Sequence, residues 1–178
     1  FFGISTIWLC VAIAFILVYI EIQISISFID DLSGLYNRKY MNHYLNKLQN
    51  NKTKHVYGFL LDVNDFKVIN DTYGHLSGDR AIIHIGKILQ NTVGNGCVAI
   101  RMGGDEFVIF AILKSNEEAL ALKKHIEQNV RQFNIHSKEP FHLSFSIGIA
   151  KYNGNIDTFL SAMDDSMYEA KNMHRLMQ

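Results

Sequence analysis

Cysteine, proline and tryptophan are scarce in this sequence, and neither sign of charge is in excess. The two cysteines, Cys10 and Cys97, have no metal-ligand spacing between them, which argues against a disulfide framework and against a zinc site. Lysine plus arginine and aspartate plus glutamate both number 17, so the formal net charge is zero and no nucleic-acid partner is expected. Any phosphate binding must therefore depend on a local group of residues.

The sequence does contain one long uncharged stretch, at its beginning. Residues 1–20 have no charged side chain and are mostly Ile, Val, Leu, Phe and Ala, and about 20 such residues can span a bilayer as a helix. We therefore predict a transmembrane helix over residues 1–20 and a short linker helix over residues 21–30. A signal peptide and a buried core helix are the alternatives. The stretch has no basic start, however, and Trp8 and Tyr19 suit interfacial anchors.

The remaining residues, 31–178, show alternating helix and strand patterns. Apolar spacing predicts helices over residues 37–48, around 81–89 and around 156–170. A short helix over residues 66–73 that ends before Gly74 is also predicted, as is a helix over residues 116–133 with Asn116 as its cap. Strands are predicted over residues 56–61, 97–102, 107–113 and 141–149. A hairpin of strands covered by helices implies an α+β sandwich and not a doubly wound parallel sheet.

Two carboxylates lie at the tip of the predicted hairpin, in the segment Gly103-Gly104-Asp105-Glu106. Glycines let the backbone approach a ligand closely, and adjacent carboxylates repel each other unless a cation lies near them. Asp62 ends the strand over residues 56–61, so neighbouring strand ends would join the three acids into a site suited to Mg²⁺. An ordinary acidic turn is the alternative.

A second group of polar residues follows Asp62 directly. Lys67 could neutralise phosphate charge, while the amide of Asn70 and the carboxylate of Asp79 match the donor and acceptor edge of guanine. The alternatives are a solvated lysine, a helix-capping asparagine and an N-cap aspartate.

Several ordered segments together resemble the GGDEF family of diguanylate cyclases, over Asp31 to about Arg175. The segment from Arg101 to Phe107 carries the family's name motif intact. Residues 31–38 resemble D-x-L-T-G-L-x-N-R with Ser33 in place of threonine, and residues 62–79 resemble D-x-D-x-F-K-x-x-N-D-x-x-G-H-x-x-G-D with Asn64 in place of the second aspartate. Residues 146–150 and 168–171 resemble the family's late strand and final helix.

This resemblance implies a fold and an activity. The fold would be that of the nucleotide-cyclase/polymerase palm, an α+β, ferredoxin-like core whose antiparallel sheet is covered by helices, preceded here by the transmembrane helix. The enzyme would condense two GTP into cyclic di-GMP and two pyrophosphate by two-metal phosphoryl transfer across a homodimer. Its location would be the bacterial inner membrane, with the catalytic domain in the cytoplasm.

The resemblance also assigns roles to residues. Two Mg²⁺ or Mn²⁺ ions would be held by Asp62, the main-chain carbonyl of Val63, Asp105 and Glu106, with Asp105 accepting the proton of the attacking 3′-hydroxyl. The phosphates would be surrounded by Phe66, Lys67, Gly103, Gly104, Lys171 and Arg175, and Lys67 would stabilise charge in the transition state. Asn70 and Asp79 would bind guanine, with His75 close to the nucleotide.

Some positions depart from the family pattern. Asn64 loses a charge, and His174 and Leu176 replace the glycine and asparagine of the family's final motif. The family's product-inhibition motif, R-x-x-D, would fall at Gly94 and Cys97, so this inhibitory site is expected to be absent. A degenerate domain that only binds GTP or dimerises, and a cyclase with another product, are the competing functions. The intact acids argue against the first of these, and Asp79 argues against an adenine-containing product.

Overall fold

A five-stranded sheet occupies the centre of the computed structural model, which describes residues 2–50, 55–94 and 96–176. The strand order is β1-β3-β4-β2-β5, with the bounds β1 Tyr36–Asn37, β2 Val56–Val63, β3 Cys97–Gly103, β4 Glu106–Ile112 and β5 Phe145–Lys151. β1 runs parallel to β3, and the other neighbouring pairs are antiparallel. The predicted α+β class is thus observed, but the sheet is mixed and not wholly antiparallel.

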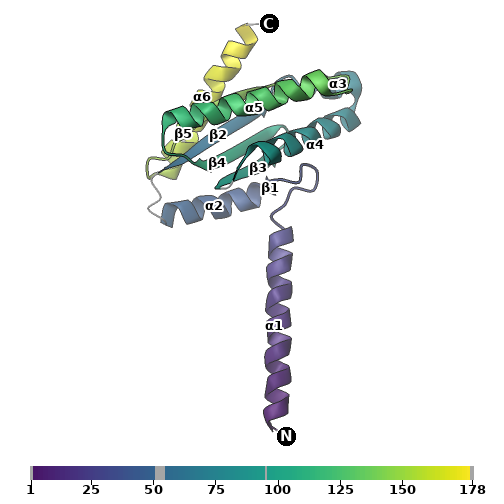
Figure 1. Cartoon of the computed structure of the whole chain (residues 1–178), viewed down its shortest axis with the longest axis vertical. Helices are drawn as coiled ribbons and strands as arrows, with labels where there is room; N and C mark the ends of the chain where they lie inside the picture. The colour runs from purple at the N-terminus through teal and green to yellow at the C-terminus, as the bar shows by residue number, and fades with distance from the viewer. Residues whose placement is uncertain (1, 51–54, 95, 177–178) are drawn as a thin grey trace.

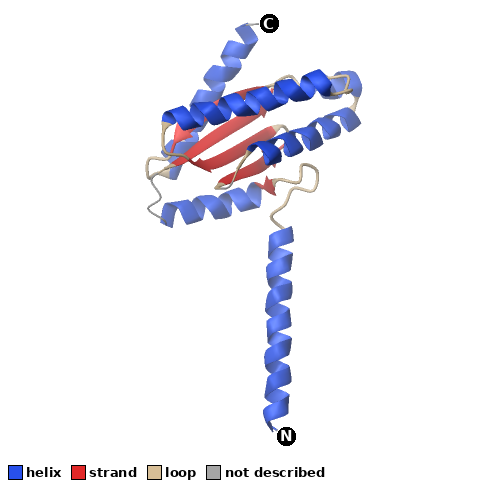
Figure 2. Ribbon diagram, viewed as in Figure 1, coloured by secondary structure: helices blue, strands red, loops and turns tan. Residues whose placement is uncertain are grey.

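Helices cover both faces of this sheet (Figures 1 and 2). α4 (His75–Thr92) and α5 (Asn116–His136) lie on one face, α2 (Arg38–Asn50) and α6 (Ile156–Leu176) lie on the other, and the short α3 (Phe66–Tyr73) leads from β2 into α4. The alternation of side chains along β2 divides the core between these layers. Phe59 and Leu61 belong to the cluster under α4 and α5, while Val56 and Leu60 belong to the cluster with α2 and α6. The same alternation directs Asp62 toward α6.

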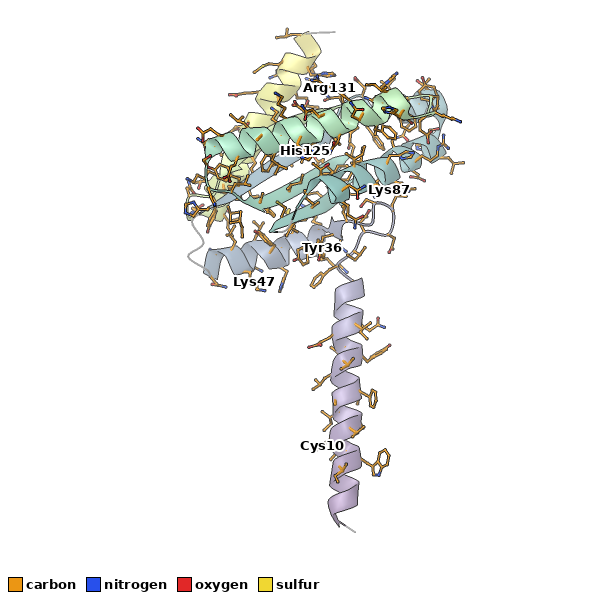
Figure 3. All side chains as sticks on the ribbon, in the orientation of Figure 1. Cys10, Tyr36, Lys47, Lys87, His125 and Arg131 are labelled. Carbon is orange, nitrogen blue, oxygen red and sulfur yellow. The ribbon has the colours of Figure 1, made fainter. Side chains whose placement is uncertain are left out.

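Helix α1 (Phe2–Ile26) stands away from the sheet and its covering helices (Figure 1). Its side chains from Ile7 to Gln23, including that of Cys10 in Figure 3, are exposed. Within the described ranges, no helix combines the length and apolar character needed to cross a membrane, so the structure does not support the transmembrane helix predicted over residues 1–20. The helix continues through the predicted boundary at Ile20 because neither glycine nor proline interrupts it there.

The strand β1 was absent from the sequence prediction. Its two residues pair with Ile100 and Arg101 of β3, and Asn37 also accepts hydrogen bonds from the N–H groups of Lys39 and Tyr40 through its side-chain oxygen. A strand of two residues has no alternation to detect.

The predictions for β5 and for the cap of α5 were partly wrong. Phe141 and Leu143 are buried as their alternation predicted, but β5 begins only at Phe145, because the Asn134 side chain bonds both the N–H and the carbonyl of Leu143. The N-cap of α5 is Ser115 and not Asn116, since the Ser115 hydroxyl accepts a hydrogen bond from the helix.

Candidate functional site

The turn between β3 and β4 needs its two glycines for their backbone angles. Gly103 has φ 147° and Gly104 has φ 53°, which side chains rarely permit, although an added Cβ would meet no neighbouring atom at either position. Glu106 opens β4 directly opposite Asp62 of β2, and the N–H of Val63 donates to the carbonyl of Asp105 at 3.2 Å. The ends of β2 and of the hairpin are therefore neighbours.

Asp62 is paired with a cation from α6. The Lys171 ammonium lies 2.8 Å from Asp62 Oδ1, and the Asp62 side chain is only 9% exposed. A buried carboxylate needs such a counter-charge, because desolvation otherwise disfavours its ionised form. The fold thus brings together Asp62 and Lys171, which lie more than a hundred residues apart in the sequence.

Asp105 lies close enough to Asp62 for their charges to interact. Burial, and then the negative charge of Asp62, raise the pKa of the Asp105 carboxyl above its ordinary value, although Lys171 and Arg101 act in the opposite direction. Two carboxylates that repel each other in a partly buried site favour the binding of a cation.

The donor set can be compared with the needs of a divalent cation. In the described part of the chain, no cluster of three or more His, Cys, Asp or Glu side chains is placed to hold a metal. Asp62, Asp105 and Glu106 nonetheless offer the hard oxygen ligands that Mg²⁺ prefers, and the repulsion that raises the pKa of Asp105 is the kind that a cation relieves. The chemistry of these donors therefore fits the predicted ions.

Helix α3 begins directly after β2 because Asp65 adopts a left-handed backbone conformation, with φ 57°. The turn places Phe66 against the core and leaves Lys67 exposed on the first turn of α3. His75 is exposed at the start of α4. Asp79 lies inside α4, whose N-cap is Gly74, so the interpretation of Asp79 as an N-cap is wrong.

The predicted guanine-binding residues meet where α3 joins α4. The side-chain amide of Asn70 packs so closely on Gly78 that a Cβ at position 78 would overlap with it. The carbonyl of Asn70 also accepts a hydrogen bond from the N–H of Gly74 at 2.9 Å. Asn70 of α3 therefore lies against the turn of α4 that carries Asp79.

Asn64 makes its contacts with β5 and the residues just before it. The Ser146 hydroxyl donates to Asn64 Oδ1 at 2.7 Å, and Asn64 Nδ2 donates to the Ser144 hydroxyl at 3.1 Å. Asn64 and Ser146 are both buried. The Asn64 amide thus uses one donor and one acceptor within a cluster of neutral side chains. Asparagine in place of the family's aspartate at this position therefore leaves the acidic group at the hairpin unchanged.

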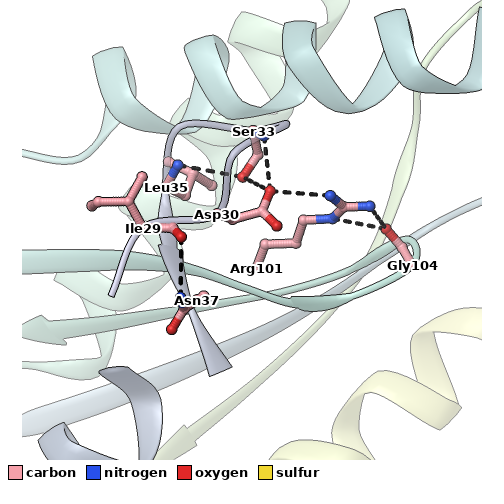
Figure 4. A network of polar contacts seen from close by, with 7 residues as sticks. All are labelled: Ile29, Asp30, Ser33, Leu35, Asn37, Arg101 and Gly104. Carbon is pink, nitrogen blue, oxygen red and sulfur yellow. Dashed lines mark hydrogen bonds and ion pairs between the residues drawn. The ribbon is translucent and has the colours of Figure 1, made fainter. Parts of the chain in front are cut away.

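A network of polar contacts that was not predicted from the sequence supports the signature turn (Figure 4). Arg101 donates to the Gly104 carbonyl from Nε at 3.0 Å and from Nη2 at 2.8 Å, while its Nη1 lies 3.0 Å from Asp30 Oδ1. The same oxygen of Asp30 accepts hydrogen bonds from the N–H and the hydroxyl of Ser33. The aspartate two residues before Leu32 is Asp30, so the resemblance to D-x-L begins at Asp30 and not at Asp31. This spacing was the sequence signal from which a role for Asp30 could have been predicted.

The end of α6 matches its predicted role only in part. Lys171 reaches Asp62, but Arg175 is exposed on the last turn, and His174 Nε2 lies 3.6 Å from Asp65 Oδ2. The structure therefore brings Lys171 to the acids and leaves the placement of Arg175 on phosphate a prediction.

Comparison with known proteins gives one consistent result. Residues 27–176 match the family model described as "Diguanylate cyclase, GGDEF domain". The chain is 31% identical over 152 residues to the diguanylate cyclase DgcP of Escherichia coli, covering 82% of this chain and 45% of DgcP. It is 33% identical to the response regulator PleD of Caulobacter vibrioides, covering 80% of this chain and 33% of PleD. The chain thus spans less than half the length of these two relatives.

The fold is also found among solved structures. The GGDEF domain of YfiN from Pseudomonas aeruginosa superposes with a TM-score of 0.72 and 29% identity, covering 79% of this chain and 92% of that chain. The sheet and its helices are therefore shared with a domain of known structure.

Proposed function

The chain belongs to the GGDEF-domain family of diguanylate cyclases, and from that membership we propose that it condenses two molecules of GTP into cyclic di-GMP and two of pyrophosphate. The observation that carries the proposal is the meeting of Asp62, Asp105 and Lys171 beside the turn of the β3–β4 hairpin. Phosphoryl transfer requires oxygen ligands for cations beside a fixed positive charge, and these residues supply both.

The residues around the turn suit a bound triphosphate. Gly103 and Gly104 are exposed and carry no side chain that would keep phosphate oxygens from the backbone. Lys67, exposed on the first turn of α3, would offset the charge that develops in the transition state. We assign guanine binding to Asn70 and Asp79, with His75 beside the nucleotide, because an amide and a carboxylate complement the donor and acceptor edge of the base.

Asp62, the Val63 carbonyl, Asp105 and Glu106 would hold two Mg²⁺ or Mn²⁺ ions, which would lower the charge of the phosphates and acidify the attacking hydroxyl. Asp105 would accept the proton of the 3′-hydroxyl. Lys171, which lies beside Asp62, would also stabilise negative charge on the phosphates.

Two chains must meet for the reaction to occur. Within residues 2–50, 55–94 and 96–176, one domain offers one proposed set of guanine-binding residues and one signature turn, whereas the product contains two guanylates. We propose a homodimer in which each 3′-hydroxyl faces the α-phosphate held by the other chain. Catalysis then depends on the encounter of two loaded domains.

The location stays a prediction. We propose attachment to the bacterial inner membrane through residues 1–20, with the catalytic domain in the cytoplasm where GTP is available. The exposed apolar side chains of α1, such as Trp8 at 68% and Phe15 at 72%, support this proposal. The test is the amount of protein in the membrane fraction of cells. It is measured for the chain and for a variant that lacks residues 1–20. An unchanged distribution would contradict this proposal.

Incubating the purified chain with GTP and Mg²⁺ and identifying the product by mass spectrometry tests the function. Cyclic di-GMP and pyrophosphate are the expected products. Binding of GTP without turnover would instead identify a degenerate domain, and a different cyclic nucleotide would identify another cyclase; either result would overturn the proposal.

A further inference from the structure

A chain of polar contacts joins the α3–α4 corner to the segment between α5 and β5. Glu139 of that segment accepts a hydrogen bond from Arg80 Nε at 3.1 Å, and its other oxygen lies 3.0 Å from His84 Nε2. Burial opposes the ionisation of Glu139, but hydrogen bonds from His84 and Arg80 hold its pKa below its ordinary value, so the carboxylate accepts both bonds. Arg80 and His84 lie four residues apart on α4, so one carboxylate holds two successive turns of that helix.

The contacts continue from Arg80 into the corner itself. Arg80 Nη2 donates to the Ser77 hydroxyl at 3.0 Å, and that hydroxyl donates to the carbonyl of Tyr73 at 2.8 Å. Ser77 is buried, and Tyr73 is the last residue of α3. The guanidinium of Arg80 therefore ties together the end of α3, the first turn of α4 and Glu139.

The same corner also carries the predicted guanine-binding residues. The Asn70 amide packs on Gly78, which lies between Ser77 and Asp79. The side chain of Asp79 is exposed, so its position depends on the backbone of α4. A change of angle between α3 and α4 would consequently move Asn70 and Asp79 relative to each other.

We propose that Glu139 is a positioning residue for the guanine site: through Arg80 and Ser77 it holds the α3–α4 corner in the geometry in which Asn70 and Asp79 bind one base together. The proposal rests on the assignment of guanine binding to these two residues. Without the Glu139 carboxylate, GTP must order the corner as it binds, and the cost appears as lost affinity. Because Arg80 is 46% exposed, its ion pair should add little to the stability of the fold.

Glu139→Gln and Arg80→Gln, singly and together, test this proposal in the full chain. Glu127→Gln on α5 is the matched control. GTP binding is measured by calorimetry, and KM and kcat are measured from pyrophosphate release. Each single change should raise the dissociation constant and KM for GTP about fivefold or more while kcat and the melting temperature change little. The double variant should bind GTP no more weakly than the weaker-binding single variant, because both changes break the same chain of contacts.

Inosine triphosphate distinguishes positioning from a general loss of affinity. It lacks the exocyclic amino group from which Asp79 would accept a hydrogen bond, so Glu139→Gln should weaken its binding less than that of GTP. Wild-type affinity for GTP in both single variants, equal losses for the two nucleotides, or fully additive losses would overturn the proposal. A wild-type chain that binds no GTP would instead overturn the proposed function, and the inference with it.

Discussion

Asp105 and Glu106 are neighbours in the signature turn, but they differ in environment. Asp105 is half-buried and is repelled by Asp62, whereas Glu106 is exposed. We expect Asp105→Asn to reduce cyclic di-GMP synthesis by at least about a hundredfold, the usual cost of losing a general base. Glu106→Gln should also reduce it strongly, because the change removes a carboxylate that would hold the metal ions. Without metal, the melting temperature of Asp105→Asn should be no lower than that of the wild type, since the change removes a repulsion. The free energy of unfolding of Glu106→Gln should lie within about 0.5 kcal/mol of the wild-type value.

Product formation and thermal unfolding measure these two effects separately. Asp164→Asn, an exposed change on α6, is the control for a lost surface carboxylate. If either turn variant kept turnover near that of the wild type while still requiring a metal, that residue would have no part in the chemistry.

Asp30 should contribute more to stability and activity than its neighbour Asp31. Partial burial opposes its ionisation, but hydrogen bonds from Ser33 and the ion pair with Arg101 hold the pKa of Asp30 below its ordinary value. Its stabilising effect is therefore complete above the ordinary aspartate pKa and is lost as the pH falls through the lowered value in the folded protein. Asp30→Asn should destabilise the chain by about 0.5–1 kcal/mol at neutral pH and lower activity, because Arg101 also holds the Gly104 carbonyl.

Chemical unfolding at pH 7 and near pH 3 measures this difference, with Asp31→Asn as the matched control. The two variants should differ at pH 7 and converge in acid. Equal stability and equal activity at pH 7 would show that the Asp30–Arg101 pair does not support the turn.

At the scale of elements, strand β3 begins where the family's product-inhibition motif would lie. Gly94 precedes the strand, Cys97 opens it, and burial raises the pKa of the Cys97 thiol, so neither residue carries charge at neutral pH. We expect added cyclic di-GMP to slow initial rates little through this face. The double variant Gly94→Arg with Cys97→Asp should gain inhibition, since an added side chain at position 94 meets open space.

Initial rates with added product, and product binding to Glu106→Gln, test this prediction. Binding at low micromolar concentration in the native sequence that disappears on mutation of β3 would contradict it.

The sequence predicted best the elements whose ends it marks. α3 was predicted with the observed bounds because Gly74 follows it, and the expected meeting of Asp62 with the hairpin followed from strands that end together. β1 was missed because a strand of two residues shows no period. The start of β5 was predicted too early, because the alternation of buried side chains does not reveal that the Asn134 side chain, and not a neighbouring strand, bonds the backbone of Leu143. Contacts between distant segments, such as Asp62 with Lys171, required the fold itself.

At the scale of the whole molecule, α1 stands apart from the sheet domain (Figure 1), and the segment between α1 and β1, which includes Asp30, joins the two. An arrangement of two such helices side by side would bring two catalytic domains to a high local concentration. No new contact within either domain is needed for that effect. The rate should therefore depend on how often two GTP-loaded domains meet.

A variant that starts near Phe28 should accordingly be weakly active when dilute, and its specific activity should rise with concentration. Replacing α1 with a parallel dimeric coiled coil should restore turnover at low concentration, because the second domain is then supplied within the same assembly. A monomeric helix of equal length in the same place is the control, and sedimentation establishes the oligomeric state of each variant. Specific activity that stayed constant over a wide dilution series, in a variant shown to be monomeric throughout, would contradict the dimer model, because a single domain would then complete both bonds of the product.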